Sequence, residues 1–214
     1  KSKSVRKTRR YLIDEVRSIL TKAQEVRPEM VPYFALASFA GIRPEEMSSQ
    51  PVKVGDTTFK PNVLTWENID LKRGEITIPH TVSKTGEMVD TIEDKTIAMP
   101  ENLVKWLVPY KAEGDVFPFS HSSLARWRRE VYKKAKVQSR QDGLRHSCGA
   151  FTYFHEGLEV AVDRLRHESP AMLMKTYKGE TASLTAKKRK AEGAEYFSIV
   201  PVSEKVIQLK RKTA

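Results

Sequence analysis

Three side chains in one short stretch of the chain have the chemistry to act together on a phosphate. Arg145 lies in the segment LRHS, His167 in LRHES and Tyr177 in KTYKG. Attack on a phosphodiester needs cations near the non-bridging oxygens, hydrogen-bond donors directed at the developing charge, and a nucleophile in line. A tyrosine nucleophile leaves a covalent phosphotyrosine, which conserves the bond energy so that a strand can be rejoined without a cofactor. The segment from Asp142 to Tyr177 therefore suits phosphodiester chemistry.

Two further candidates lie far upstream. Arg43, before Pro44, is either a surface arginine that opens a short helix or a rigidly held guanidinium that grips two phosphate oxygens. In the second interpretation Glu46, one helical turn later, orients it. Lys84 lies where a strand runs into a turn: it is either solvated or, at a hairpin tip, a general acid whose pKa is lowered by nearby arginines and which protonates a leaving 5′-oxygen.

The downstream candidates also have ordinary structural interpretations. Arg145 opens an apolar helical face, where an unpaired guanidinium is costly, so a phosphate or a carboxylate is its expected partner. His146, its neighbour, is a candidate supporting residue. His167 near a helix end suits a core or capping histidine equally well. Tyr177 follows a methionine-rich segment and is also compatible with a packing role.

Composition indicates a polyanionic partner. Lys and Arg number 38 against 27 Asp and Glu, a net charge of +11, which favours DNA or RNA, with an acidic membrane surface as a distant second. Cys148 is the only cysteine, which rules out an internal disulfide and a thiolate zinc cluster and favours a reducing intracellular compartment. The most apolar stretch contains Pro32 and is shorter than the roughly 20 residues needed to cross a bilayer. Because the first residue is Lys1, a missing upstream domain is expected.

Hydrophobic spacing predicts a mainly α fold with a small three-stranded antiparallel sheet (α+β). Asp14 is a plausible N-cap of a first amphipathic helix, and a second helix is expected over 30–40. Short strands are expected around Leu64, Ile76 and Ile97. Helical patterns then dominate, in ENLVKWLVPY, SLARWRREVYKKA, LRHSCGAFTYF, EVAVDRLRH and SPAMLMKTY, before a strand-like YFSIV and a basic tail.

Three parts of the chain are distinguished on this basis. Residues 1–10 form a basic arm, either solvated or in contact with DNA, and residues 11–180 form the domain that carries the candidate catalytic residues. The C-terminal segment 181–214 either docks on a neighbouring protomer, by a helix or by adding a strand, or packs Phe197 and Ile199 on its own domain.

The order Arg43, Lys84, Arg145, His167, Tyr177 resembles the catalytic domain of the tyrosine recombinases, the phage integrase family. AGIRPEEM is similar to that family's first-arginine box, and VLTWENIDLKRGEITI, VSKTGE and KTIAMP are similar to its three-stranded sheet with the hairpin lysine. DGLRHSCGAFTYFHEG resembles its second-arginine box, and LRHESPAMLMKTYKG its histidine and nucleophile box. The resemblance covers roughly residues 11–179.

The resemblance implies a site-specific recombinase that acts on double-stranded DNA in the prokaryotic cytoplasm, as a tetramer on DNA and as a monomer for this isolated domain. Arg43 and Arg145 would clamp the scissile phosphate, His167 would donate a hydrogen bond, Tyr177 would form a 3′-phosphotyrosyl intermediate, and Lys84 would protonate the leaving 5′-hydroxyl. No metal and no nucleotide cofactor is required.

Two positions depart from the family pattern. Asp142 stands where a histidine or lysine is usual, at a position associated with accepting the tyrosine proton. A carboxylate beside a phosphate adds negative charge and opposes anion binding, so slower chemistry or an altered proton path is expected. Arg166 stands where a glycine commonly precedes the histidine.

Three other functions compete with this interpretation. A DNA-binding protein that kept the fold but lost the chemistry is favoured by Asp142. A type IB topoisomerase shares the tyrosine chemistry but relaxes supercoils without a second site. A metal-dependent nuclease needs paired carboxylates and is inhibited by EDTA.

Overall fold

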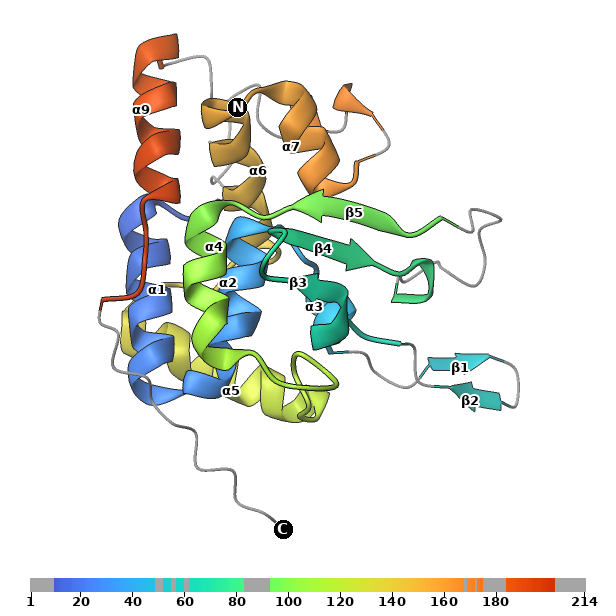
Figure 1. Cartoon of the computed structure of the whole chain (residues 1–214). Coiled ribbons are helices and arrows are strands. Elements are labelled where there is room, and N and C mark those ends of the chain that lie inside the picture. Colours follow the sequence, from blue (N-terminus) through green and yellow to red (C-terminus); the bar gives the residue numbers. More distant parts are fainter. Residues whose placement is uncertain are drawn as a thin grey trace, which may run out of the picture.

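Helices make up most of the structure, and a small sheet lies along one side of them (Figure 1). The computed structural model describes residues 10–48, 52–54, 57–59, 62–82, 93–167, 169–171, 173–174 and 184–202. The longer helices are α1 Ile13–Val26, α2 Val31–Phe39, α5 His121–Ala135, α6 Gly143–His155, α7 Leu158–Leu165 and α9 Ala186–Phe197. The shorter ones are α3 Pro44–Met47 and α4 Glu101–Leu107, with 3₁₀ turns at Pro28–Met30, Trp66–Asn68, His80–Val82 and Val108–Tyr110.

The first two helices carry the apolar patterns that the sequence predicted. Helix α1 buries one face, and α2 is buried at all nine positions, which makes it the central helix against which α1, α4 and α6 pack. The expected N-cap at Asp14 is wrong. The helix begins one residue earlier, at Ile13, and the Glu15 carboxylate accepts a hydrogen bond of 2.7 Å from the backbone N–H of Leu12. Asp14 therefore lies in the first turn.

The predicted three-stranded antiparallel sheet is confirmed, in the order β3-β4-β5. Strand β3 is Ile69–Asp70, β4 is Glu75–Ile78 and β5 is Lys95–Ala98, and Ile76 pairs with both Ile69 and Ile97. The strand expected around Leu64 is wrong. The Leu64 N–H donates to the Glu46 carbonyl (2.7 Å), and the Leu64 carbonyl accepts from the Val116 N–H (3.0 Å). This segment therefore forms hydrogen bonds with α3 and with a loop, and not with a strand of the sheet.

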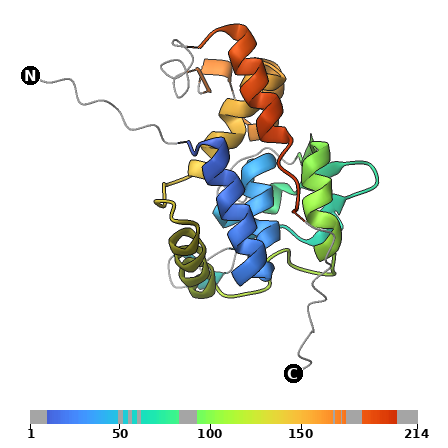
Figure 2. The ribbon, with the colours of Figure 1, turned by 90° about the vertical axis from the view of Figure 1, so that its left-hand side faces the viewer.

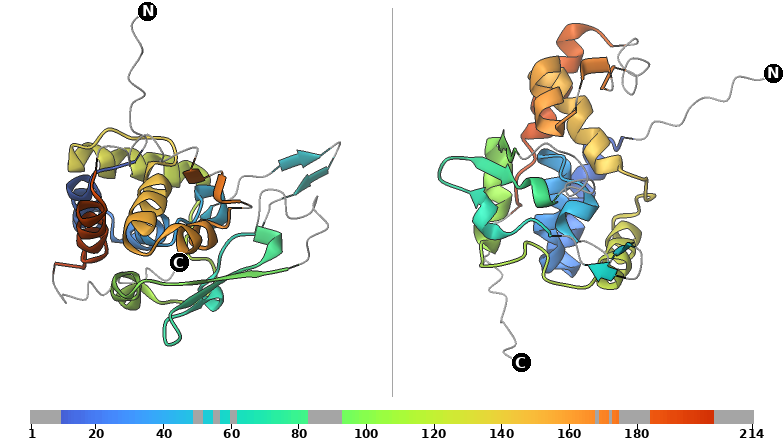
Figure 3. Two further views of the ribbon diagram at one scale, coloured as in Figure 1. Left: turned by 90° about the horizontal axis from the view of Figure 1, so that it is seen from above. Right: turned by 90° about the vertical axis from the view of Figure 1, so that its right-hand side faces the viewer.

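A second, two-stranded hairpin was not predicted. Strands β1 Val52–Val54 and β2 Thr57–Phe59 pair with each other and extend to one side of the helices (Figure 1). Seen from the right, the three-stranded sheet flanks the helical body on the left, and the hairpin lies apart from it at the lower right (Figure 3).

The expected strand YFSIV is wrong, because Tyr196 and Phe197 end helix α9. The Tyr196 hydroxyl donates to the carbonyl of Ser38 (2.6 Å), and its ring stacks on Phe151 at 4.3 Å between centroids. Helix α9 therefore packs on its own domain, beside α6 and close to α1 (Figure 2). At Gly193 a Cβ would lie 2.6 Å from the Cβ of His155, so the close approach of the two helices requires glycine there.

The segment that leads into α6 is fixed to the start of the chain. Arg140 donates to both carboxylate oxygens of Glu15 (2.8 and 2.7 Å), and its backbone N–H donates to the Tyr11 hydroxyl (2.7 Å). The Ser147 hydroxyl accepts from the Tyr11 N–H (2.7 Å) and donates to the Tyr11 carbonyl (3.2 Å). These contacts hold the first turn of α6, and with it Arg145, against α1.

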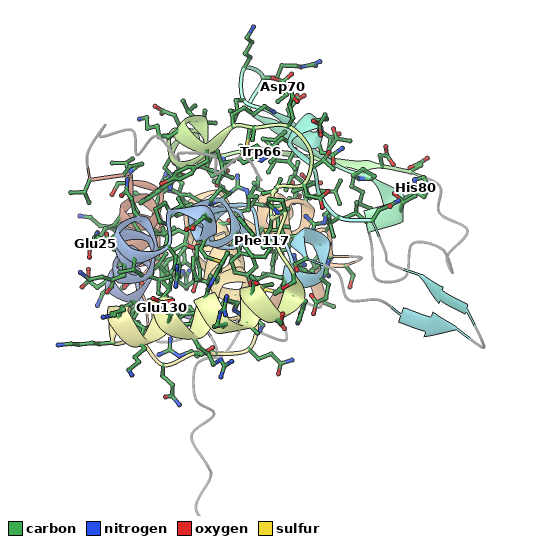
Figure 4. The ribbon with its side chains drawn as sticks, turned by 90° about the horizontal axis from the view of Figure 1, so that it is seen from below. Glu25, Trp66, Asp70, His80, Phe117 and Glu130 are labelled. Carbon is green, nitrogen blue, oxygen red and sulfur yellow. The ribbon has the colours of Figure 1, made fainter. Side chains whose placement is uncertain are left out.

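The apolar interior divides into two clusters. The larger lies between α1, α2, α4, α5 and the sheet, and Phe117 occupies its middle when the molecule is seen from below, with Asp70 and His80 at the periphery (Figure 4). The smaller joins α6, α7 and the helical turn that follows, and consists of Cys148, Ala150, Ala161, Leu165 and Leu173. Among the described helices, none is long and apolar enough to span a bilayer.

Candidate phosphate-binding site

Arg43 occupies the turn between the central helix and α3. Its backbone N–H donates to Glu46 Oε2 (2.7 Å) and its Nη1 to Glu46 Oε1 (3.2 Å). The Arg43 side chain is 42% exposed, whereas that of Glu46 is 5% exposed. A buried carboxylate thus contacts a guanidinium that is open to solvent. The orienting role of Glu46 stays a prediction.

Arg145 is buried in the first turn of α6 and connects two distant segments. Its Nη1 donates to the Gly41 carbonyl and its Nη2 to the Leu165 carbonyl. Both contacts are to neutral carbonyls and not to the carboxylate that the sequence offered as one partner. The other expected partner, a phosphate, stays a prediction. Burial lowers the pKa of Arg145 to about 9, and the charges of Arg43 and Arg166 act in the same direction. Positive charge is therefore concentrated at this place.

Gly41 allows the end of the central helix to lie close to Arg145 on α6 and to Leu165 on α7. It ends the central helix with a φ of +62°, in the left-handed region that favours glycine. A Cβ there would lie 2.5 Å from Leu165 Cδ2 and 3.7 Å from Arg145 Nη1. Any larger residue would push the α2 turn away from α6 and α7.

His167 lies close enough to Arg145 and Arg43 for their charges to act on its imidazole. It is half-buried two residues beyond the end of α7, and its backbone N–H donates to the Val162 carbonyl (2.9 Å). Burial lowers its pKa to about 4, helped by the positive charges of Arg145 and Arg43 and then of His146 and Arg166. The imidazole is therefore neutral near pH 7 and can donate one hydrogen bond.

Arg166 is the functional candidate that the sequence did not assign. Its Nη2 donates to both oxygens of Glu46 (2.8 and 2.6 Å), and its side chain is 6% exposed. Its φ of +54° lies in the left-handed region, which explains why glycine suits this position. No spacing in the sequence joins Arg166 to Glu46, 120 residues away, so only the fold could reveal this ion pair. We refer to Arg43, Arg145 and Arg166 with Glu46 as the arginine cluster.

Asp142 is placed differently. It is exposed at the N-cap of α6, with a φ of +52°, and its carbonyl accepts from the His146 N–H (2.8 Å). Its charge is among those that raise the pKa of Tyr33, on the side of α2. Within the described part of the chain, no hydrogen bond or ion pair joins the Asp142 side chain to the arginine cluster.

Lys84 and Tyr177 lie outside the described residues, as do residues 1–9 of the basic arm and residues 203–214 of the tail. Their predicted roles stay predictions.

A cavity of about 440 Å³ opens beside His167, between β5 and α7. Its walls combine charged and apolar side chains: Lys95, Thr96, Ile97, Glu159, Val162, Asp163, Arg166, His167 and Pro170. Among the residues placed in the structure, no group of three or more His, Cys, Asp or Glu side chains is arranged to hold a metal ion.

Comparison with solved structures identifies the fold. The chain superposes on a XerA recombinase with a TM-score of 0.55 at 18% identity, covering 82% of this chain and 66% of that one. It superposes on an integrase from mycobacterium phage Brujita with a TM-score of 0.57 at 18% identity, covering 96% of this chain and 63% of that one. The chain thus spans less than two thirds of the length of either. No protein-family model and no curated protein sequence matches it.

The chain therefore has the fold of a tyrosine-recombinase catalytic domain, as its sequence predicted. At this identity the likeness concerns the fold, and the chemistry must be argued from the side chains.

Proposed function

We propose that this chain is the catalytic part of a site-specific DNA recombinase or integrase, which cuts and rejoins DNA through a 3′-phosphotyrosyl intermediate. The observation that carries the proposal is the convergence of Arg43, Arg145 and His167, from three distant parts of the chain, on one site of net positive charge. A phosphodiester is an anion whose charge increases in the transition state, so such a site stabilises the transition state more than the ground state.

The described residues have distinct parts in this mechanism. Arg43 offers an exposed guanidinium to the non-bridging oxygens. Arg145 is buried, and it adds positive charge beneath the surface of the site. Neutral His167 donates one hydrogen bond to the same phosphate. Tyr177 gives up its hydroxyl proton, to Asp142 or to solvent, and attacks the phosphorus. The bond to the 5′-oxygen breaks, and Lys84 gives that oxygen its proton. A 5′-hydroxyl of a partner strand then reverses the step.

The experiment is a trapping assay on nicked suicide DNA. We expect a covalent protein–DNA adduct that forms without added metal and is lost in Tyr177→Phe, with Tyr153→Phe as the matched control because Tyr153 lies on α6. An adduct that persists in Tyr177→Phe removes the nucleophile assignment. Duplex DNA is the proposed partner, with a tetramer on DNA and a monomer in its absence.

A DNA-binding protein of the same fold without strand cleavage is the second candidate. It is favoured by Asp142, which stands where the family has a histidine or lysine and whose side chain, within the described part of the chain, makes no hydrogen bond or ion pair with the arginine cluster. Comparison of wild type with Asp142→His separates the two. Adduct formation by the wild type supports the recombinase, whereas adduct formation only in Asp142→His indicates loss of activity in this chain.

A further inference from the structure

The Glu46 carboxylate binds two arginines at once. It accepts hydrogen bonds from the backbone and Nη1 of Arg43, and both its oxygens accept from Nη2 of Arg166. Both Arg166 and Glu46 are almost fully buried, whereas Arg43 is the exposed partner. A buried carboxylate without Arg166 would have only Arg43 to neutralise it.

The backbone of Arg166 makes its presence costly. Its φ of +54° is unfavourable for a side chain with a Cβ, and the same turn could be made more easily with glycine. The guanidinium is also buried, which lowers its pKa, and the charge of Glu46 acts in the opposite direction. Strained and buried residues of this kind persist where the surrounding structure uses them.

We propose that Arg166 is a positioning residue that takes up the charge of Glu46, so that the guanidinium of Arg43 keeps its own charge for a phosphate. This inference rests on the proposed function only in naming the phosphate as that of DNA. With Arg166 present, Arg43, Glu46 and Arg166 together carry one positive charge. Without it, Arg43 and Glu46 form a neutral pair, and Arg43 is drawn toward the carboxylate.

Two further observations agree with this role. Arg166 lines the cavity beside His167, so its charge acts on the same space. Its other amino group, Nη1, is buried and has no hydrogen-bond partner among the described residues, so only Nη2 of the two amino groups contacts Glu46. The contact is therefore a pairing of charges and not a two-pronged fork, which would fix orientation as well.

The test first lowers the net charge of Arg43, Glu46 and Arg166 by one and then restores it with a second substitution. Arg166→Gly relieves the backbone strain and deletes one positive charge, and the double variant Arg166→Gly with Glu46→Gln also deletes the negative one. The amide that replaces the carboxylate in Glu46→Gln keeps an oxygen that can accept from the Arg43 N–H, so the start of α3 is maintained. Binding is measured as the rise in melting temperature with millimolar sulfate, against chloride at equal ionic strength.

We expect Arg166→Gly to weaken sulfate binding by about tenfold, and the double variant to recover most of this loss. Arg166→Lys, which keeps the charge, should stay within about threefold of wild type. A purely structural role for Arg166 predicts no recovery in the double variant. Non-specific stabilisation by sulfate is common to all variants and cancels in the comparison.

Two results of the sulfate assay overturn the inference: sulfate binding in Arg166→Gly that equals the wild type, or a double variant as weak as the single one. Should Arg166→Gly fail to fold, Arg166→Asn replaces it, because asparagine also tolerates the left-handed region. The same variants are assayed for the covalent DNA adduct. Recovery of sulfate binding without any adduct in the wild type rejects the proposed function but retains the role of Arg166. A full adduct in Arg166→Gly rejects that role alone.

Discussion

His167 titrates in the field of the arginine cluster. Two separate causes, burial and the nearby positive charges, lower its pKa from an ordinary value near 6.5 to about 4. A bound phosphate cancels part of that field and favours the protonated imidazole. The protonation of His167 therefore reports whether an anion occupies the site.

This leads to a prediction on pH. Because the pKa of His167 is lower in the folded chain, the unfolded chain takes up a proton first as the pH falls through about 6.5. Stability due to this group is complete above that pH and is lost progressively toward pH 4. We expect His167→Asn to flatten the dependence of melting temperature on pH between 7 and 4, and sulfate, whose charge is fixed in this range, to stabilise the wild type more at lower pH.

The control is His121→Asn, which removes a histidine on α5, away from the arginine cluster. Equal pH profiles for wild type and His167→Asn would contradict the assignment of a strongly lowered pKa to His167.

Gly41 is the residue at which the site can be disrupted without touching a charge. Replacement by alanine meets Leu165 Cδ2 at 2.5 Å and forces a side chain onto a φ of +62°. We expect Gly41→Ala to cost at least about 2 kcal/mol in urea unfolding and to weaken sulfate binding, because the Gly41 carbonyl would move away from Arg145. Gly114→Ala, with a φ of +74° but no neighbour within 4 Å of its Cβ, is the matched control for strain alone.

At the scale of elements, sequence periodicity predicted the helices other than α9 and two of the strands, but not the contacts that join them. The apolar faces of α1 and α2 and the β4 and β5 segments follow directly from spacing. The strand predicted at Leu64 is absent because the apolar side chains of this run serve to bury it in the core. Its backbone forms hydrogen bonds with α3 and with a loop instead of with another strand. The strand expected at Tyr196 failed because a short aromatic run fits either period.

The candidate site divides in the same way. Arg43, Arg145 and His167 were predicted from side-chain type and order, because each follows or opens an apolar helical segment. The Arg166 to Glu46 pair joins residues 120 positions apart, and Arg166 was noted only as an odd residue in a glycine position. Long-range charge pairing depends on how α3 and α7 meet, and a single sequence holds no signal for that.

Helix α9 packs against α6, and the Tyr196 hydroxyl connects α9 to the central helix α2. Tyr196→Phe keeps the ring stacked on Phe151 but deletes the hydrogen bond to the Ser38 carbonyl. We expect a loss of about 1 kcal/mol in the free energy of unfolding, measured by urea denaturation. Tyr153→Phe, at a half-buried tyrosine of α6, should change it by less than about 0.5 kcal/mol. Equal losses in both variants would show that the bond to Ser38 contributes nothing specific.

At the scale of the whole molecule, the excess of 11 positive charges favours a polyanionic partner, which the proposed function takes to be duplex DNA. Helix α5 presents the exposed side chains Arg126, Arg129 and Lys133 at spacings of three and four, which places them along one face. Helix α5 lies at the bottom of the molecule in Figure 1 and α9 at its upper left, so the two helices offer separate basic surfaces. We expect the α5 face to contact the DNA backbone.

Neutralising that face tests the expectation. The triple variant Arg126→Gln, Arg129→Gln, Lys133→Gln keeps good helix formers and removes three charges. Its affinity for duplex DNA should fall at least about tenfold at low salt, and the slope of log affinity against log salt should become shallower by about 0.9 for each phosphate that is no longer neutralised. Because phosphate contacts carry no sequence information, the weakening should be similar for any DNA sequence.

The matched control is Lys187→Gln, Lys188→Gln, Lys190→Gln on α9, which removes the same number of exposed charges from the other surface. If net charge alone governs binding, both triple variants lose affinity equally and their salt slopes change together. If α5 lies on the DNA, only its variant changes the salt slope, because counterions are released only where lysine and arginine replace them at the phosphates. A larger loss from the α9 variant would place the DNA on the opposite surface and separate it from α5.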